Sequence, residues 1–103
     1  MTDARCWVLF AGNDSAYFAW ISSHPTGYVL NIRRQDDLKY VVLHRASCRT
    51  VNPARAGTEP GAFTERSYRK VCSDSIESLR TWARQYGRSD GSFSKCCSIC
   101  DPE

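Results

Sequence analysis

The apolar positions of the chain fall into short runs separated by polar turns. Residues 5–12 (RCWVLFAG) form one such run, and residues 27–34 (GYVLNIRR) and 39–46 (KYVVLHRA) form two more. Runs of this length, rich in Val and aromatic residues and bounded by turn residues, predict β-strands. Because only a short polar turn separates the second run from the third, we expect these two strands to form an antiparallel hairpin.

Two other segments space their apolar residues at helical intervals. In the first, residues 13–25 (NDSAYFAWISSHP), Tyr17, Phe18 and Ile21 would share one face, and Asp14 is suited to the N-cap position. The pattern therefore predicts a short helix between the first and second strands.

The second segment, residues 73–87 (SDSIESLRTWARQYG), has the clearest helical pattern in the chain. Asp74 followed by Glu77 has the spacing of a capping box, and Gly87 is placed to end the helix. One apolar stripe follows the 3.6-residue period and would face the core: Ile76, Leu79, Ala83 and Tyr86.

The remaining segments complete the expected fold. Residues 51–63 hold two Pro and two Gly without any period, which predicts a loop, and residues 67–72 (SYRKVC) predict a fourth strand. Strands and helices in this order predict a single α+β domain over residues 1–103. We expect a small antiparallel sheet of three or four strands, two helices and a zinc knuckle at the C-terminal end.

Composition predicts the cellular compartment of the protein and bears on the role of its cysteines. The chain has 103 residues, of which 42% are apolar, and it carries a net charge of +3. No apolar run approaches the roughly 20 residues of a membrane-spanning helix, and the first residues do not form a secretory signal. We therefore expect a cytoplasmic protein, whose cysteines stay reduced. Six cysteines in such a protein favour a metal site before disulfides.

The cysteines and one histidine are spaced as two pairs of metal ligands. His44 and Cys48 flank three residues at the end of a predicted strand, and Cys97 and Cys100 flank two residues near the C-terminus. A tetrahedral zinc site takes four N or S ligands, commonly from two short-range pairs. The sequence therefore predicts a structural Zn²⁺ bound by His44, Cys48, Cys97 and Cys100.

Other assignments of the cysteines remain open. Cys96 could replace Cys97, and Cys72 could displace His44 to give a site made only of cysteines. Cys6, inside the first predicted strand, is most simply a small buried apolar residue. Inert reduced thiols, or a disulfide or redox switch, are the alternatives to a metal.

The spacing of the four predicted ligands resembles that of a known family of zinc-binding modules. The pattern H-x3-C followed by C-x2-C-x-P, with Pro102 as its last position, resembles a small zinc-binding N-terminal module of bacterial DNA-associated and restriction-type proteins. The phrases GYVLNIRR, YVVLHRASCRTV and YRKVCSDSIESLRTWA resemble the same module, over residues 13–102. The extra Cys96 and the long interval between the two ligand pairs depart from the pattern. The resemblance implies a role in bacterial defence, such as restriction-modification, or in DNA processing.

Motifs for catalysis are missing from the sequence. A zinc deaminase needs H-x-E or C-x-E together with P-C-x-x-C, whereas here neither His is followed by that Glu and Lys95 precedes Cys96. The chain also lacks G-x-S-x-G, H-E-x-x-H and a Gly-rich phosphate loop. A Cys–His nucleophile pair is conceivable, but nothing singles out its members. We therefore predict that the protein is not an enzyme.

The basic residues instead favour a nucleic-acid partner. Most of them are Arg, which suits contacts with phosphates and base edges. The candidates lie on or after the predicted strands: Arg33, Arg45, Arg49, Arg69 and Lys70. We expect double-stranded DNA, modified DNA included, as the partner. The alternative is a protein-interaction or regulatory module with a structural zinc, and an ordinary Arg-rich surface would explain the same charges.

Overall fold

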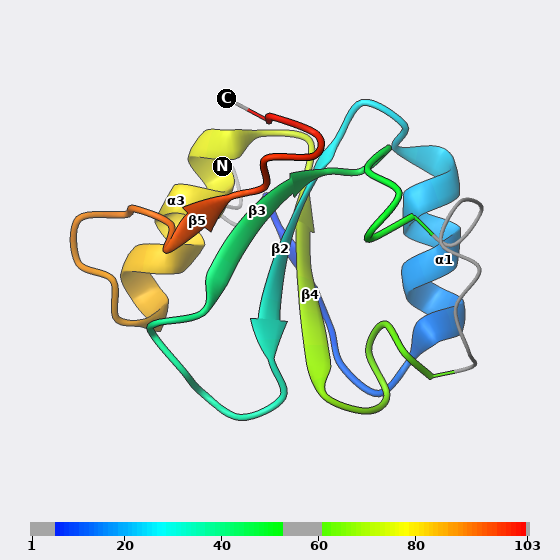
Figure 1. Cartoon of the computed structure of the whole chain (residues 1–103), viewed down its shortest axis with the longest axis horizontal. Helices are drawn as coiled ribbons and strands as arrows, with labels where there is room; N and C mark the ends of the chain where they lie inside the picture. The colour runs from blue at the N-terminus through cyan, green and yellow to red at the C-terminus, as the bar shows by residue number, and fades with distance from the viewer. Residues whose placement is uncertain (1–5, 53–60, 103) are drawn as a thin grey trace, which may run out of the picture.

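The computed structural model describes residues 6–52 and 61–102, and within them it has one five-stranded sheet in the order β1-β4-β2-β3-β5 (Figure 1). Neighbouring strands run antiparallel except β3 and β5, which run parallel. The strands are β1 (Val8–Phe10), β2 (Tyr28–Arg33), β3 (Val41–Arg45), β4 (Tyr68–Ser73) and β5 (Lys95–Cys96). The predicted α+β class is confirmed, and so is the hairpin of β2 and β3.

The sheet is larger than expected because of β5. This strand has only two residues, and it lies directly before the terminal cysteines, where no strand was predicted. Its pairing with β3 makes the sheet mixed, since Val42 lies opposite Lys95 and Leu43 opposite Cys96. The C-terminal segment is thereby attached along the edge of the predicted hairpin.

Two helices cover opposite sides of the sheet, as Figure 1 shows: α1 (Asp14–Ser23) and α3 (Ile76–Tyr86). Tyr17 and Ile21 of α1 are buried in one hydrophobic cluster, and Leu79 and Ala83 of α3 in another. The predicted apolar stripe of α3 therefore faces the core. None of the helices in the described residues is long and apolar enough to cross a bilayer.

The helix caps differ from the expectation by one residue. Asn13 caps α1 and Ser75 caps α3, each through a side-chain oxygen that accepts a backbone N–H of the first turn. The predicted cap Asp14 is instead buried, where its carboxylate accepts hydrogen bonds from the backbone N–H and the hydroxyl of Thr64 (2.7 and 2.6 Å). Asp74 precedes the true cap of α3.

Strand alternation decides which side chains share a face. Val29 pairs with both His44 and Cys72, so these three residues form one row across the α1 side of the sheet. Leu30, flanked by Leu43 and Val71, forms the next row on the α3 side. The predicted loop 51–63 lies mostly in residues 53–60, outside the described part of the chain.

Candidate metal centre

The first ligand pair forms where β3 ends. His44 is buried on the α1 side of the sheet, and the chain then turns sharply, with the N–H of Cys48 donating to the carbonyl of Arg45 (3.0 Å). The carbonyl of Cys48 in turn accepts from the N–H groups of Val51 and Asn52 (3.0 and 2.9 Å). These turns bring the Cys48 side chain back beside the His44 ring.

The second pair forms directly after β5. The N–H of Cys97 donates to the carbonyl of Leu43 (2.9 Å), which fixes Cys97 against β3. The N–H of Asp101 then donates to the carbonyl of Cys97 (2.9 Å) and closes a tight turn. Asp101 has a φ of 47°, in the left-handed region that Asp tolerates better than most residues. The turn directs Cys97 and Cys100 toward the same point.

The four predicted ligands meet in one cluster. The ligand atoms of His44, Cys48, Cys97 and Cys100 all lie within 4.8 Å of one another. The Cys48 and Cys97 sulfurs are 4.0 Å apart, whereas two sulfurs bound tetrahedrally at ~2.3 Å from one metal ion would be ~3.8 Å apart. The group is therefore close enough to hold a metal ion, and its soft sulfur and imidazole donors fit Zn²⁺ chemistry.

The structure also separates the other cysteines from this cluster. Cys96 packs against the cluster of Leu43 on the α3 side, so adjacent Cys96 and Cys97 lie on opposite sides of the sheet. Cys72 is fully buried in the α1-side core and is not part of the ligand group. Cys6 is exposed, contrary to the expected buried position, because the strand begins only at Val8. All six cysteines are free thiols.

Thr50 contacts two of the four ligands. Its hydroxyl oxygen lies 3.0 Å from the sulfur of Cys48 and 3.3 Å from Nδ1 of His44. Groups that bond directly to metal ligands hold them in orientation and tune their basicity. The sequence spacing alone did not identify Thr50, although its place two residues after a ligand was a usable signal.

Arg45 fastens the C-terminal turn to the end of β3. Its backbone N–H donates to the sulfur of Cys100 (3.2 Å), and its guanidinium donates to the carbonyls of Cys100 and Asp101 (both 3.0 Å). A hydrogen bond from a backbone N–H favours the charged form of a thiol. Arg45 is therefore part of the support of the cluster.

The local environment sets the charge of the ligands. Burial, together with the positive charges of Lys70 and Lys95, lowers the pKa of His44 to about 4, so its imidazole is neutral and able to bind a metal. Burial raises the pKa of Cys97, but hydrogen bonds from the backbone of Cys100 and Ile99 outweigh it, and the net pKa is lowered. Burial and the nearby sulfurs raise the pKa of Cys100 to about 12. A bound cation would remove that repulsion between sulfurs.

The predicted nucleic-acid residues are not brought into one patch. Arg69 lies on the α3 side, where it bonds to the carbonyl of Arg33 (2.8 Å) and to Asp36 (3.1 Å). Lys70 is only 3% exposed, on the α1 side. Arg49 is exposed beside the metal cluster.

Arg33, one of the predicted nucleic-acid residues, belongs to a row of side chains whose grouping the sequence did not predict. Its guanidinium lies over the ring of Tyr40 (4.3 Å), and it also pairs with Asp37 (3.3 Å). Tyr68 is directly opposite Arg33 on β4, and the rings of Tyr40 and Tyr68 are 5.9 Å apart. Asn31 lies two residues before Arg33 on the same face of β2, and its Nδ2 donates to the Tyr40 hydroxyl (3.3 Å).

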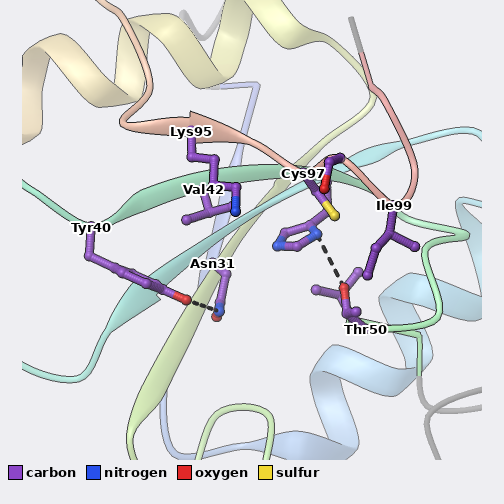
Figure 2. Close-up of a pocket in the computed structure, with 10 residues that line it drawn as sticks. Asn31, Tyr40, Val42, Thr50, Lys95, Cys97 and Ile99 are labelled. Atoms are coloured by element: carbon purple, nitrogen blue, oxygen red, sulfur yellow. Dashed lines mark hydrogen bonds between the residues drawn. The ribbon is translucent and has the colours of Figure 1, made fainter.

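A pocket of about 310 Å³ connects this row with the metal cluster (Figure 2). Its ten lining residues include two of the ligands, His44 and Cys97, together with Thr50. The others are Asn31, Tyr40, Val42, Val51, Lys95, Ser98 and Ile99. Alternation along β2 and β3 places Asn31, Tyr40 and Val42 on the same side of the sheet as His44, which was the signal in the sequence.

Comparison with known proteins found no relative of this chain. No protein-family model, no curated protein and no solved structure matches the chain. The functional assignment therefore depends on the chain's own residues, through their geometry and through the motifs of the sequence.

Proposed function

We propose that this protein is a non-catalytic, zinc-stabilised module that binds nucleic acid, with double-stranded DNA as its partner. The row of cationic and aromatic side chains on the sheet beside the metal cluster supports this proposal most directly.

The donor set supports zinc in a structural role. Three Cys and one His are a common ligand set of structural zinc, which is four-coordinate and closed. Four protein ligands converge here within 4.8 Å, which fills the coordination that a catalytic zinc would keep open for water or substrate. The metal would join the C-terminal turn to β3, a role in folding.

The sheet face beside the cluster has the chemistry of a nucleic-acid surface. Arg33 stacks on Tyr40, and Lys95 is exposed on the neighbouring edge strand. Within the described residues, Lys95 has no ion pair with a carboxylate. On such surfaces the cationic side chains bind phosphates, and the aromatic rings stack on bases. Arg49, exposed in the turn of the metal cluster, would extend the same surface.

The resemblance of the metal motif to a module of bacterial DNA-associated proteins supports the choice of DNA. On that basis we place the protein in a bacterial defence or DNA-processing system, acting in the cytoplasm. Base modification would then be read at the pocket beside the row rather than by the phosphate contacts, which carry no sequence information.

Fluorescence anisotropy with labelled nucleic acids tests the proposal. We expect the zinc-loaded protein to bind duplex DNA, with an affinity that falls steeply as salt rises, because each phosphate contact contributes about 0.9 to the slope of log K against log salt. Arg33→Glu, Arg49→Glu and Lys95→Glu should each weaken binding and reduce that slope. Arg84→Glu, on α3 at the other side of the sheet, is the matched control and should leave binding unchanged.

The opposite result is equally informative. If duplex DNA, single strands and RNA all fail to bind at low salt, nucleic-acid recognition is ruled out. A protein partner would then be the better explanation, and β1 would be its first candidate site. Val8 and Leu9 of this edge strand are 44% and 42% exposed, and an edge strand can accept another strand.

A further inference from the structure

The pocket beside the metal cluster has an apolar lining and a few polar groups aimed into it. Val42 and Val51 supply buried apolar surface, and the Tyr40 ring forms one wall. Figure 2 shows Asn31 and Tyr40 directed toward each other at one end, with Ile99 and Cys97 at the other. Pockets that bind small molecules have this composition.

Lys70 fixes which way the Asn31 amide points. The Lys70 ammonium donates to Oδ1 of Asn31 (2.8 Å) and to the carbonyl of Phe63 (2.7 Å). A lysine ammonium has donors and no acceptor, so the amide oxygen must face Lys70. The NH₂ group of Asn31 therefore faces Tyr40 and the pocket, and only one of its two protons is used by the Tyr40 hydroxyl (3.3 Å).

The polar lining consequently offers donors more than acceptors. The second N–H of Asn31 and the ammonium of Lys95 can only donate. The hydroxyls of Ser98 and Thr50 can also donate, and none of the ten lining residues is Asp or Glu. A ligand that fits has an apolar part for Val42 and Val51, carbonyl oxygens to accept these hydrogen bonds, and a negative charge near Lys95.

We propose that this pocket binds one unpaired, carbonyl-bearing nucleobase of the bound DNA, with the Asn31 amide donating to the carbonyl and Lys95 contacting the adjacent phosphate. This inference rests on the proposed nucleic-acid function. Thymine, cytosine and guanine carry a carbonyl oxygen, whereas adenine carries none. The apolar residues Val42 and Val51 would also contact the methyl group of thymine.

A base reaches such a pocket only outside the helix stack, which costs least where pairing is already lost. The test therefore uses one duplex in three forms, with a single site as a T·A pair, a T·T mismatch or an A·A mismatch. We expect the protein to bind the T·T duplex about 10-fold more tightly than the other two, as one good base contact allows. Both mismatches disrupt pairing, so the A·A duplex controls for a general preference for distorted DNA.

Two variants test the pocket itself. Asn31→Asp replaces the donor with an acceptor of the same shape and keeps a partner for Lys70, so it should abolish the T·T preference and leave salt-sensitive binding of the paired duplex. Ser98→Phe, at an exposed lining position, should block the pocket with the same outcome. Metal content and thermal stability confirm that each variant is folded.

Failure of the base-pocket proposal and failure of the proposed nucleic-acid function would give different results. Equal affinity of the wild type for all three duplexes, or an unchanged preference in both variants, overturns the base pocket and leaves nucleic-acid binding in place. Absence of salt-sensitive binding to any duplex overturns the proposed function and the pocket together.

Discussion

The backbone N–H of Arg45 donates to the sulfur of Cys100 at 3.2 Å, across 55 residues of sequence. Arg45 is the last residue of β3, and Cys100 is the last ligand of the C-terminal turn. The cluster therefore joins two segments that are far apart in the sequence. The pairing of β5 with β3 and the guanidinium of Arg45 hold the same C-terminal segment.

Loss of one ligand should release that end. Cys100→Ser should remove bound metal and lower the melting temperature markedly, because structural zinc contributes about 10–16 kcal/mol of apparent binding free energy in small zinc-binding peptides. We expect about one zinc per chain in the wild type by elemental analysis. Cys6→Ser, at an exposed cysteine outside the cluster, should keep both the metal and the stability. A folded wild type that holds no metal would contradict the site.

The hydroxyl of Thr50 should matter for affinity rather than for folding. Thr50→Val keeps the shape of the side chain but removes its contacts with Cys48 and His44. Loss of such a supporting group weakens metal binding by about 10- to 100-fold. Competition with a chelating dye measures the change. Thr26→Val, at an exposed threonine in the turn before β2, makes the same substitution away from the metal and should have no effect.

The buried lysine should give the protein an alkaline rise in stability. Burial lowers the pKa of Lys70 from 10.5 to about 8, and the nearby carboxylate of Asp14 opposes that shift only in part. Between these two pH values the unfolded chain holds a proton that the folded chain has lost, so the free energy of unfolding increases with pH. The change amounts to about 3 kcal/mol at most.

Chemical denaturation at several pH values between 8 and 10.5 checks this expectation. Lys70→Met removes the titrating group, so the wild type should gain stability relative to this variant as pH rises. Groups that do not interact with Lys70 contribute equally in both proteins and cancel in the difference. Parallel curves for the two proteins would show that Lys70 titrates normally.

One hydrogen bond ties α1 to the turn of the metal cluster. The buried Tyr17 hydroxyl donates to the carbonyl of Val51 (2.6 Å). Tyr17→Phe leaves that carbonyl without its partner, which should cost about 1–3 kcal/mol of unfolding free energy. Tyr28→Phe is the matched control, because its hydroxyl makes no hydrogen bond with the described residues. Equal stability of the two variants in urea would show that water replaces the lost bond.

The sequence predicted most of the fold because its strands and helices have clear local patterns. The hairpin of β2 and β3 and the stripe of α3 follow from alternation and helical period alone. The two-residue strand β5 has no such pattern, since it exists only by pairing with β3. Its register also decided between Cys96 and Cys97, which local spacing left open.

The basic residues were harder to place because their long side chains find local partners. Arg45 and Arg69 donate to backbone carbonyls that the sequence does not reveal, and Lys70 is buried on the α1 side of the sheet. Asn31 was not identified from the sequence, and Tyr40 was considered only as one of several aromatic residues, yet the register of β2 and β3 puts both beside the metal cluster. A surface of this kind is formed by residues of neighbouring strands, so the spacing of residues within one strand does not predict it.

The short strand β5 has a consequence for how the protein responds to its surroundings. Four residues that line the pocket, Lys95, Cys97, Ser98 and Ile99, belong to the segment that the proposed metal would hold against β3. Metal and pocket ligand would therefore favour the same docked arrangement, and each would raise the affinity of the other by an equal factor. When zinc is scarce, the proposed recognition would weaken by that same factor, so the supply of the metal would regulate binding.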